Sequence, residues 1–175
     1  MKIRIFIEST WKGPQKKDGV AEWLVECRDG GKELTQKGFI HLQSGTQTEA
    51  TLMGLINSLV VIRWLVEKKG QAESPVKLYT RCGGVVGAAS MNWPQKWKEN
   101  GWKNSSGDPV KRFDLWEKYL ELLGDLKVDA SVTKHEYRSL LETDCAREYR
   151  EWQQALERER GHQISIQEAL AFPTE

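Results

Sequence analysis

The sequence has few cysteines, almost no net charge and no long uninterrupted apolar run. Cys27, Cys82 and Cys145 are odd in number and far apart, without CxxC or Cys/His spacing, so neither a disulfide framework nor a zinc site is indicated. A formal net charge of +1 means that any basic surface must be local. The most apolar stretch, residues 52–66, is too short to span a bilayer and contains Asn57. We therefore expect a cytoplasmic protein with no membrane partner.

Length and composition indicate one folded domain. The chain has 175 residues, 39% of them hydrophobic and 29% charged, which is enough to close a single core without metal or disulfide crosslinks. We expect this domain to span residues 1–155 and a helical extension or tail to span residues 156–175. We also expect a monomer, with the C-terminal helix open to a protein partner.

Hydrophobic periodicity predicts the order of helices and strands. Apolar residues at period two predict strands at 2–8, 21–27 and 34–41, and from residue 46 the period becomes that of a helix ending near Gly70. Later elements are expected at 76–80 (strand), 93–102 and 112–123 (helices), 128–132 (strand) and 139–160 (helix). This order predicts an α/β fold with a five-stranded mixed sheet, three antiparallel strands and then parallel strands, flanked by helices.

A segment between residues 93 and 112 combines tryptophan with lysine. It holds five basic and two acidic residues, and Trp93 and Trp97 share a helix face because they are four residues apart. Lysines that meet phosphates give salt-dependent affinity, and a tryptophan can stack on a base or sugar. The alternative is that the tryptophans are core residues, which we prefer for Trp93 and Trp116 and leave open for Trp97, Trp102 and the lysines.

The same segment carries a family resemblance. The motif WKENGWK (97–103), followed by GDPVK (107–111) and DLW (114–116), resembles the basic handle of type 1 ribonuclease H. IFIEST (5–10) and LYTRC (78–82) resemble the first and fourth strands of that family and occur in the right order. The resemblance covers residues 1–155 and implies the ribonuclease H-like fold, an RNA/DNA hybrid or duplex as partner, and Mg²⁺ or Mn²⁺ as cofactor. It implies nucleic-acid contacts from Trp97, Lys98, Trp102, Lys103 and Lys111.

The start of the first helix has two compatible interpretations. Thr46-Gln47-Thr48-Glu49 is a capping box, and we assign Glu49 to this structural role. The resemblance implies that Thr46 also holds a DNA phosphate and that Gln47 touches bases, which suits a helix N-terminus because it attracts anions. Arg112 stands where the family has the asparagine of this phosphate pocket. The site should therefore still bind an anion, but with a different geometry.

The resemblance implies four metal-binding carboxylates, and two of them are replaced. The first corresponds to Glu8 and the fourth to Asp144, but Thr51 and Arg81 occupy the second and third positions. A unit positive charge about 4 Å from a divalent ion, at an effective dielectric constant near 20, costs on the order of 8 kcal/mol. Metal binding by Glu8 and Asp144 is therefore expected to be weak or lost. His135 stands where the family has a histidine that assists product release.

Arg81 itself has two possible placements. We expect its guanidinium to occupy the space of the metal ions and to pair with Glu8 and Asp144, which would turn a catalytic cluster into an ion network. The alternative is that Arg81 points to solvent at the end of its strand. Neither placement favours hydrolysis by two metal ions.

Three functions remain open from the sequence. The first is a nucleic-acid-binding relative of ribonuclease H without hydrolytic activity. The second is an active hybrid ribonuclease with an altered metal site at Glu8 and Asp144. The third is a structural or protein-interaction module that reuses the fold. Cleavage and binding assays on one RNA/DNA hybrid would separate them.

Overall fold

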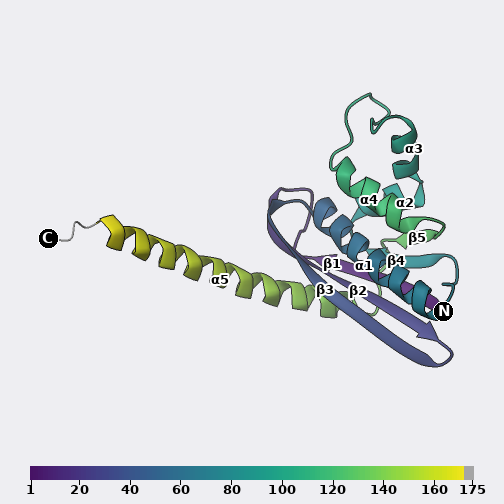
Figure 1. Cartoon of the computed structure of the whole chain (residues 1–175), viewed down its shortest axis with the longest axis horizontal. Coiled ribbons are helices and arrows are strands. Elements are labelled where there is room, and N and C mark those ends of the chain that lie inside the picture. Colours follow the sequence, from purple (N-terminus) through teal and green to yellow (C-terminus); the bar gives the residue numbers. More distant parts are fainter. Residues whose placement is uncertain (172–175) are drawn as a thin grey trace.

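The computed structural model describes residues 1–171, which form a five-stranded mixed sheet with helices on both faces (Figure 1). The strand order is β3-β2-β1-β4-β5, with β1, β2 and β3 antiparallel and β4 and β5 parallel to β1. The predicted fold class is confirmed. The elements are β1 (Lys2–Ser9), β2 (Lys17–Asp29), β3 (Lys32–Gly45), α1 (Gln47–Lys69), β4 (Val76–Thr80), α2 (Gly83–Ser90), α3 (Trp93–Glu99), α4 (Phe113–Leu123), β5 (Val128–Ser131) and α5 (Arg138–Ala171).

The sheet separates two layers of buried side chains. Ile3, Ile5 and Ile7 alternate along β1 and join the main core under α1, because successive side chains of a strand point to opposite faces. Phe6 points the other way and packs in a smaller cluster with α5. Glu8 continues the even-numbered series, so the strand register places its carboxylate on the α5 face.

Helix α1 is long and apolar enough, by length and composition alone, to cross a membrane. Nine of its residues are nevertheless buried, among them Leu52, Leu55 and Leu59, which pack in the core formed with the sheet. Burial of one apolar face against a sheet is typical of the central helix of a folded domain.

Four predicted elements have different ends in the structure. Strands β2 and β3 extend well beyond the predicted ranges 21–27 and 34–41. The backbone pairing between the two strands continues through exposed polar residues at their ends. Helix α3 ends at Glu99, not at residue 102, because Gly101 (φ 67°) and Trp102 (φ 62°) adopt left-handed conformations. The predicted end of the last helix at residue 160 is also wrong, since α5 continues to Ala171.

Only the first part of α5 packs on the sheet, over β1 and β2, and the rest projects away from the body (Figure 1). His41 of β3 holds the helix where it leaves the sheet: its Nε2 lies 2.9 Å from Glu148 Oε1, and its ring lies 5.2 Å from that of Trp152. The domain boundary at residue 155 stays a prediction, and residues 172–175 of the expected tail lie outside the described part of the chain.

Candidate nucleic-acid site and carboxylate cluster

Glu8 is the centre of a buried ion network. Its side chain is 2% exposed, and His135 Nε2 lies 3.0 Å from its Oε1. Arg138 Nε donates to the same oxygen at 3.3 Å, and Arg81 Nε lies 3.7 Å from Oε2. One imidazole and two guanidinium groups therefore surround the carboxylate that we expected, from the resemblance, at the first metal-ligand position.

The expected pairing of Arg81 is half right. Its guanidinium contacts Glu8 as expected, but its second partner is Glu142, to which Nη2 donates. The expected contact with Asp144 is wrong, because Asp144 pairs with Arg147 at 3.0 Å on the next turn of α5. Arg81 keeps 45% of its side chain exposed, so it closes the cluster and also faces solvent.

A further carboxylate, Glu22, was missed by sequence reasoning. It lies directly opposite Glu8 in the β1–β2 register and is completely buried. Neither of its oxygens has a hydrogen-bond partner in the described part of the chain, and Lys37 Nζ lies 3.7 Å from Oε1. Burial first, and then the neighbouring Asp144, raise the pKa of Glu22 to about 7. The antiparallel pairing of the first two predicted strands was the signal that could have revealed Glu22.

Lys37 joins the two parts of this cluster. Its Nζ lies 3.7 Å from Asp144 Oδ2 and also 3.7 Å from Glu22 Oε1, while its side chain is 57% exposed. Lys37 and Arg138 also escaped the sequence analysis, because their partners come from strands and helices far away in the sequence.

The donor set does not fit a pair of divalent cations. Thr51, which we expected at the second carboxylate position, is a neutral side chain buried in α1, and Arg81 is a permanent cation. Glu8 and Asp144 are already paired with basic side chains. Within residues 1–171, no three or more His, Cys, Asp and Glu side chains are grouped so as to hold a metal ion. We therefore derive no chemical step through Mg²⁺ or Mn²⁺.

A polar groove of about 760 Å³ lies at the N-terminus of α1. The Glu49 amide donates to Thr46 Oγ1 at 3.2 Å, which confirms Thr46 as the predicted cap. The Glu49 carboxylate accepts from the Thr46 hydroxyl at 3.1 Å instead of from the Thr46 amide of a full capping box. Arg112 donates to Glu49 at 2.7 Å and to both oxygens of Asp114 at 3.1 Å, so acids on both sides partly neutralise it. Four predicted contact residues line this groove together: Thr46, Gln47, Lys111 and Arg112.

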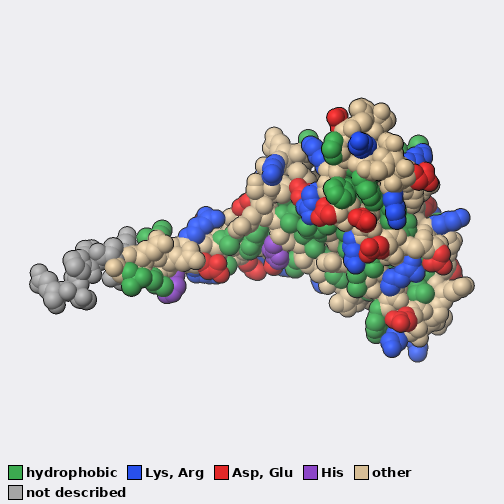
Figure 2. Space-filling model, turned by 45° about the horizontal axis from the view of Figure 1, so that its top comes forward, with side chains coloured by type: hydrophobic (Ala, Val, Ile, Leu, Met, Phe, Trp, Pro, Cys, Tyr) green, Lys and Arg blue, Asp and Glu red, His purple; other side chains and the backbone are tan. Residues whose placement is uncertain are grey.

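The handle forms a separate hollow of about 520 Å³ beside α3. Trp97 and Lys103 line it. Trp97 and Trp102 both pack partly buried against the core, and Lys98 is exposed. Trp93 also lines this hollow and is 40% exposed, so its assignment to the core is wrong: it is the first residue of the short helix α3, in which Pro94 is the buried residue. Trp116 is 3% exposed, as expected for a core residue. Figure 2 shows blue basic and red acidic side chains interspersed over the body of the molecule.

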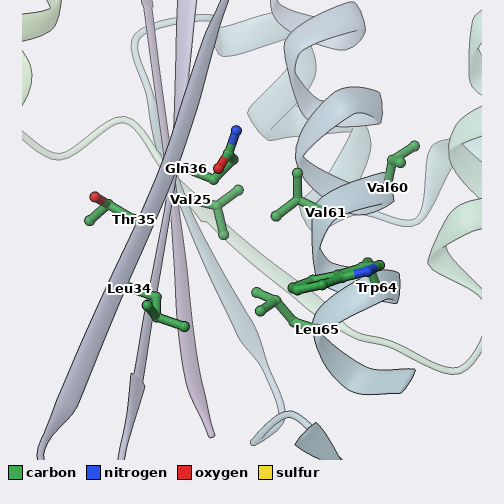
Figure 3. A pocket seen from close by; sticks show the side chains of 8 residues that line it. All are labelled: Val25, Leu34, Thr35, Gln36, Val60, Val61, Trp64 and Leu65. Carbon is green, nitrogen blue, oxygen red and sulfur yellow. The ribbon is translucent and has the colours of Figure 1, made fainter. Parts of the chain in front are cut away.

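An apolar pocket of about 530 Å³ lies on the α1 side of the sheet. Val61, Trp64 and Leu65 extend from α1 toward the strands, and Val25 points from β2 toward them (Figure 3). The pocket has no charged lining residue, so it is chemically unlike the two polar hollows.

The sequence is similar to known proteins over about half of the chain. No protein-family model matches the sequence. Ribonuclease H of Clostridium botulinum (strain Hall) is 32% identical over 103 residues, which cover 55% of this chain and 69% of that protein. This chain belongs to the ribonuclease H family. Ribonuclease HI of Synechocystis is 34% identical over 94 residues, covering 54% of this chain and 52% of that protein.

Solved ribonuclease H structures share the fold. LC9-RNase H1, described as a type 1 RNase H with the type 2 active-site motif, superposes with a TM-score of 0.59 at 18% identity, covering 83% of this chain and 68% of that one. The foamy viral protease-reverse transcriptase in complex with an RNA/DNA hybrid gives a TM-score of 0.63 at 14% identity, covering 84% and 20%. The chain is therefore a ribonuclease HI-like protein in sequence and in fold.

Proposed function

We propose that this ribonuclease H relative binds an RNA/DNA hybrid or duplex without hydrolysing it. The observation that carries the proposal is the position of Arg81, whose guanidinium lies beside Glu8 at the third carboxylate position. A fixed cation there opposes a divalent ion, and two-metal hydrolysis depends on such ions.

The binding half of the proposal is supported by two polar hollows and by the relatives. Lysines and tryptophans line or flank the hollow beside α3, and Lys111 and Arg112 line the groove at the α1 N-terminus. Helix N-termini and basic side chains favour phosphates, and aromatic faces favour bases. Two similar structures, the foamy viral enzyme and LC11-RNase H1, are complexes with RNA/DNA hybrids.

Binding and cleavage of one RNA/DNA hybrid test the proposal together. We expect fluorescence anisotropy to show binding that weakens steeply with salt, and we expect no cleavage product with Mg²⁺ or Mn²⁺ at high protein concentration. Lys98→Ala should weaken binding roughly eight-fold at 0.1 M salt, since each phosphate contact contributes a slope of about −0.9 in log K against log salt. The slope of log K against log salt should become shallower by about 0.9.

Lys32→Ala is the matched control, because Lys32 is an exposed lysine at the far end of the β2–β3 hairpin. The Lys32→Ala variant should bind the hybrid with the affinity of the wild type. Metal-dependent cleavage by the wild type would instead establish an altered nuclease. Absence of binding at low salt would favour a protein-interaction module.

A further inference from the structure

The remnant of the carboxylate cluster contains its own positive charges. Four acidic side chains meet there, and four permanently basic side chains pair with them within 4 Å. Bare carboxylates would repel a polyanion, whereas paired ones do not. The acids are Glu8, Glu22, Glu142 and Asp144, and the bases are Lys37, Arg81, Arg138 and Arg147.

The two signs of charge differ in their exposure. The Glu8 and Asp144 side chains are 2% and 7% exposed, whereas Arg81 and Arg147 are 45% and 56% exposed. Lys37 is equally open to solvent. The cluster therefore buries Glu8 and Asp144 under basic head groups. Glu142 remains 31% exposed beside Arg81, so the side chains that a ligand meets there are mainly basic.

Arg81 directly precedes a residue of the groove at the α1 N-terminus. The next residue, Cys82, lines that groove, and its Sγ lies 3.8 Å from Thr48 Oγ1 of α1. Helix α2 begins at Gly83 without a side-chain cap, so its first amides add to the positive potential beside Arg81. The acid that lines the groove, Glu49, pairs with Arg112, so a strand of nucleic acid in the groove would meet mainly basic side chains.

We infer that Arg81, together with Arg147 of the same cluster, contacts a backbone phosphate of the bound nucleic acid. A guanidinium fits a phosphate because its donors form a planar fork that matches two phosphate oxygens. Hybrid binding is then independent of divalent cations. This inference rests on the proposed hybrid binding.

Hybrid affinity measured in EDTA and in Mg²⁺ tests the inference. We expect the wild type to bind at least as tightly in EDTA as in Mg²⁺ at equal ionic strength. Arg81→Gln and Arg147→Gln should each weaken binding roughly eight-fold at 0.1 M salt, with a salt slope shallower by about 0.9. Arg28→Gln, which removes an exposed guanidinium at the opposite end of β2, should bind like the wild type.

The outcomes separate this inference from the proposed function. If the wild type binds the hybrid in EDTA and both arginine variants bind it equally well, the inference is overturned and hybrid binding itself stands. Binding that requires Mg²⁺ would overturn it as well. If the wild type binds no hybrid under either condition, the proposed function fails first. Far-UV circular dichroism of each variant establishes that a loss of affinity is not a loss of fold.

Discussion

Arg81→Asp should tighten Mn²⁺ binding to the cluster about a thousandfold. The change removes a cation 3.7 Å from Glu8 and supplies a further acid beside Glu8 and Glu142. A unit charge about 4 Å from a divalent ion at an effective dielectric constant near 20 is worth on the order of 8 kcal/mol. Because Arg81 is 45% exposed, solvent screening reduces this to about 4 kcal/mol, or roughly three decades of affinity. Electron paramagnetic resonance of free Mn²⁺ during a titration measures the effect.

Arg28→Asp serves as the charge-matched control for this titration. It makes the same change of net charge at an exposed position on the other end of β2, where Glu26 and Glu33 are the neighbouring acids. We expect Mn²⁺ affinity within a few-fold of the wild type. Equal, tight Mn²⁺ binding by the wild type and Arg81→Asp would show that Arg81 does not exclude the metal ion.

Glu22→Gln should raise the free energy of unfolding at pH 8 by up to about 3 kcal/mol. Burial and Asp144 raise the folded-state pKa of Glu22 from its ordinary value of 4.5 to about 7. Between these pH values Glu22 holds a proton in the folded protein and has released it in the unfolded chain. The free energy of unfolding of the wild type therefore falls as the pH rises from 4.5 to about 7. Each pH unit between the two pKa values corresponds to about 1.4 kcal/mol. Glutamine removes the charge and can donate to Asp144.

Urea unfolding at pH 5, 6.5 and 8 measures this difference. The gain from Glu22→Gln should be small at pH 5 and largest at pH 8, which a uniform packing effect would not produce. Glu33→Gln, at an exposed position on β3, should leave the stability unchanged at all three values. A gain that is the same at each pH would contradict the assignment of the raised pKa to Glu22.

Much of the fold followed from the sequence because local patterns carried it. The alternation of Ile3, Ile5 and Ile7 and the helical period from residue 46 place β1 and α1 correctly. The ends of elements were less accessible. Ladder hydrogen bonds lengthen β2 and β3 through polar residues, and left-handed backbone at Gly101 and Trp102 shortens α3. Neither the longer strands nor the shorter helix depends on the spacing of apolar residues, so that spacing could not predict them.

The candidate site divides in the same way. Side-chain chemistry follows from the sequence alone: Arg81 is a cation and Thr51 is neutral wherever they lie, so the expectation that two carboxylates are replaced needed no coordinates. Partners depend on distance and solvent exclusion between segments far apart in the chain. Only the tertiary structure placed Glu142 against Arg81 and buried Glu22 opposite Glu8, because strand register and the packing of α5 decide which charges meet.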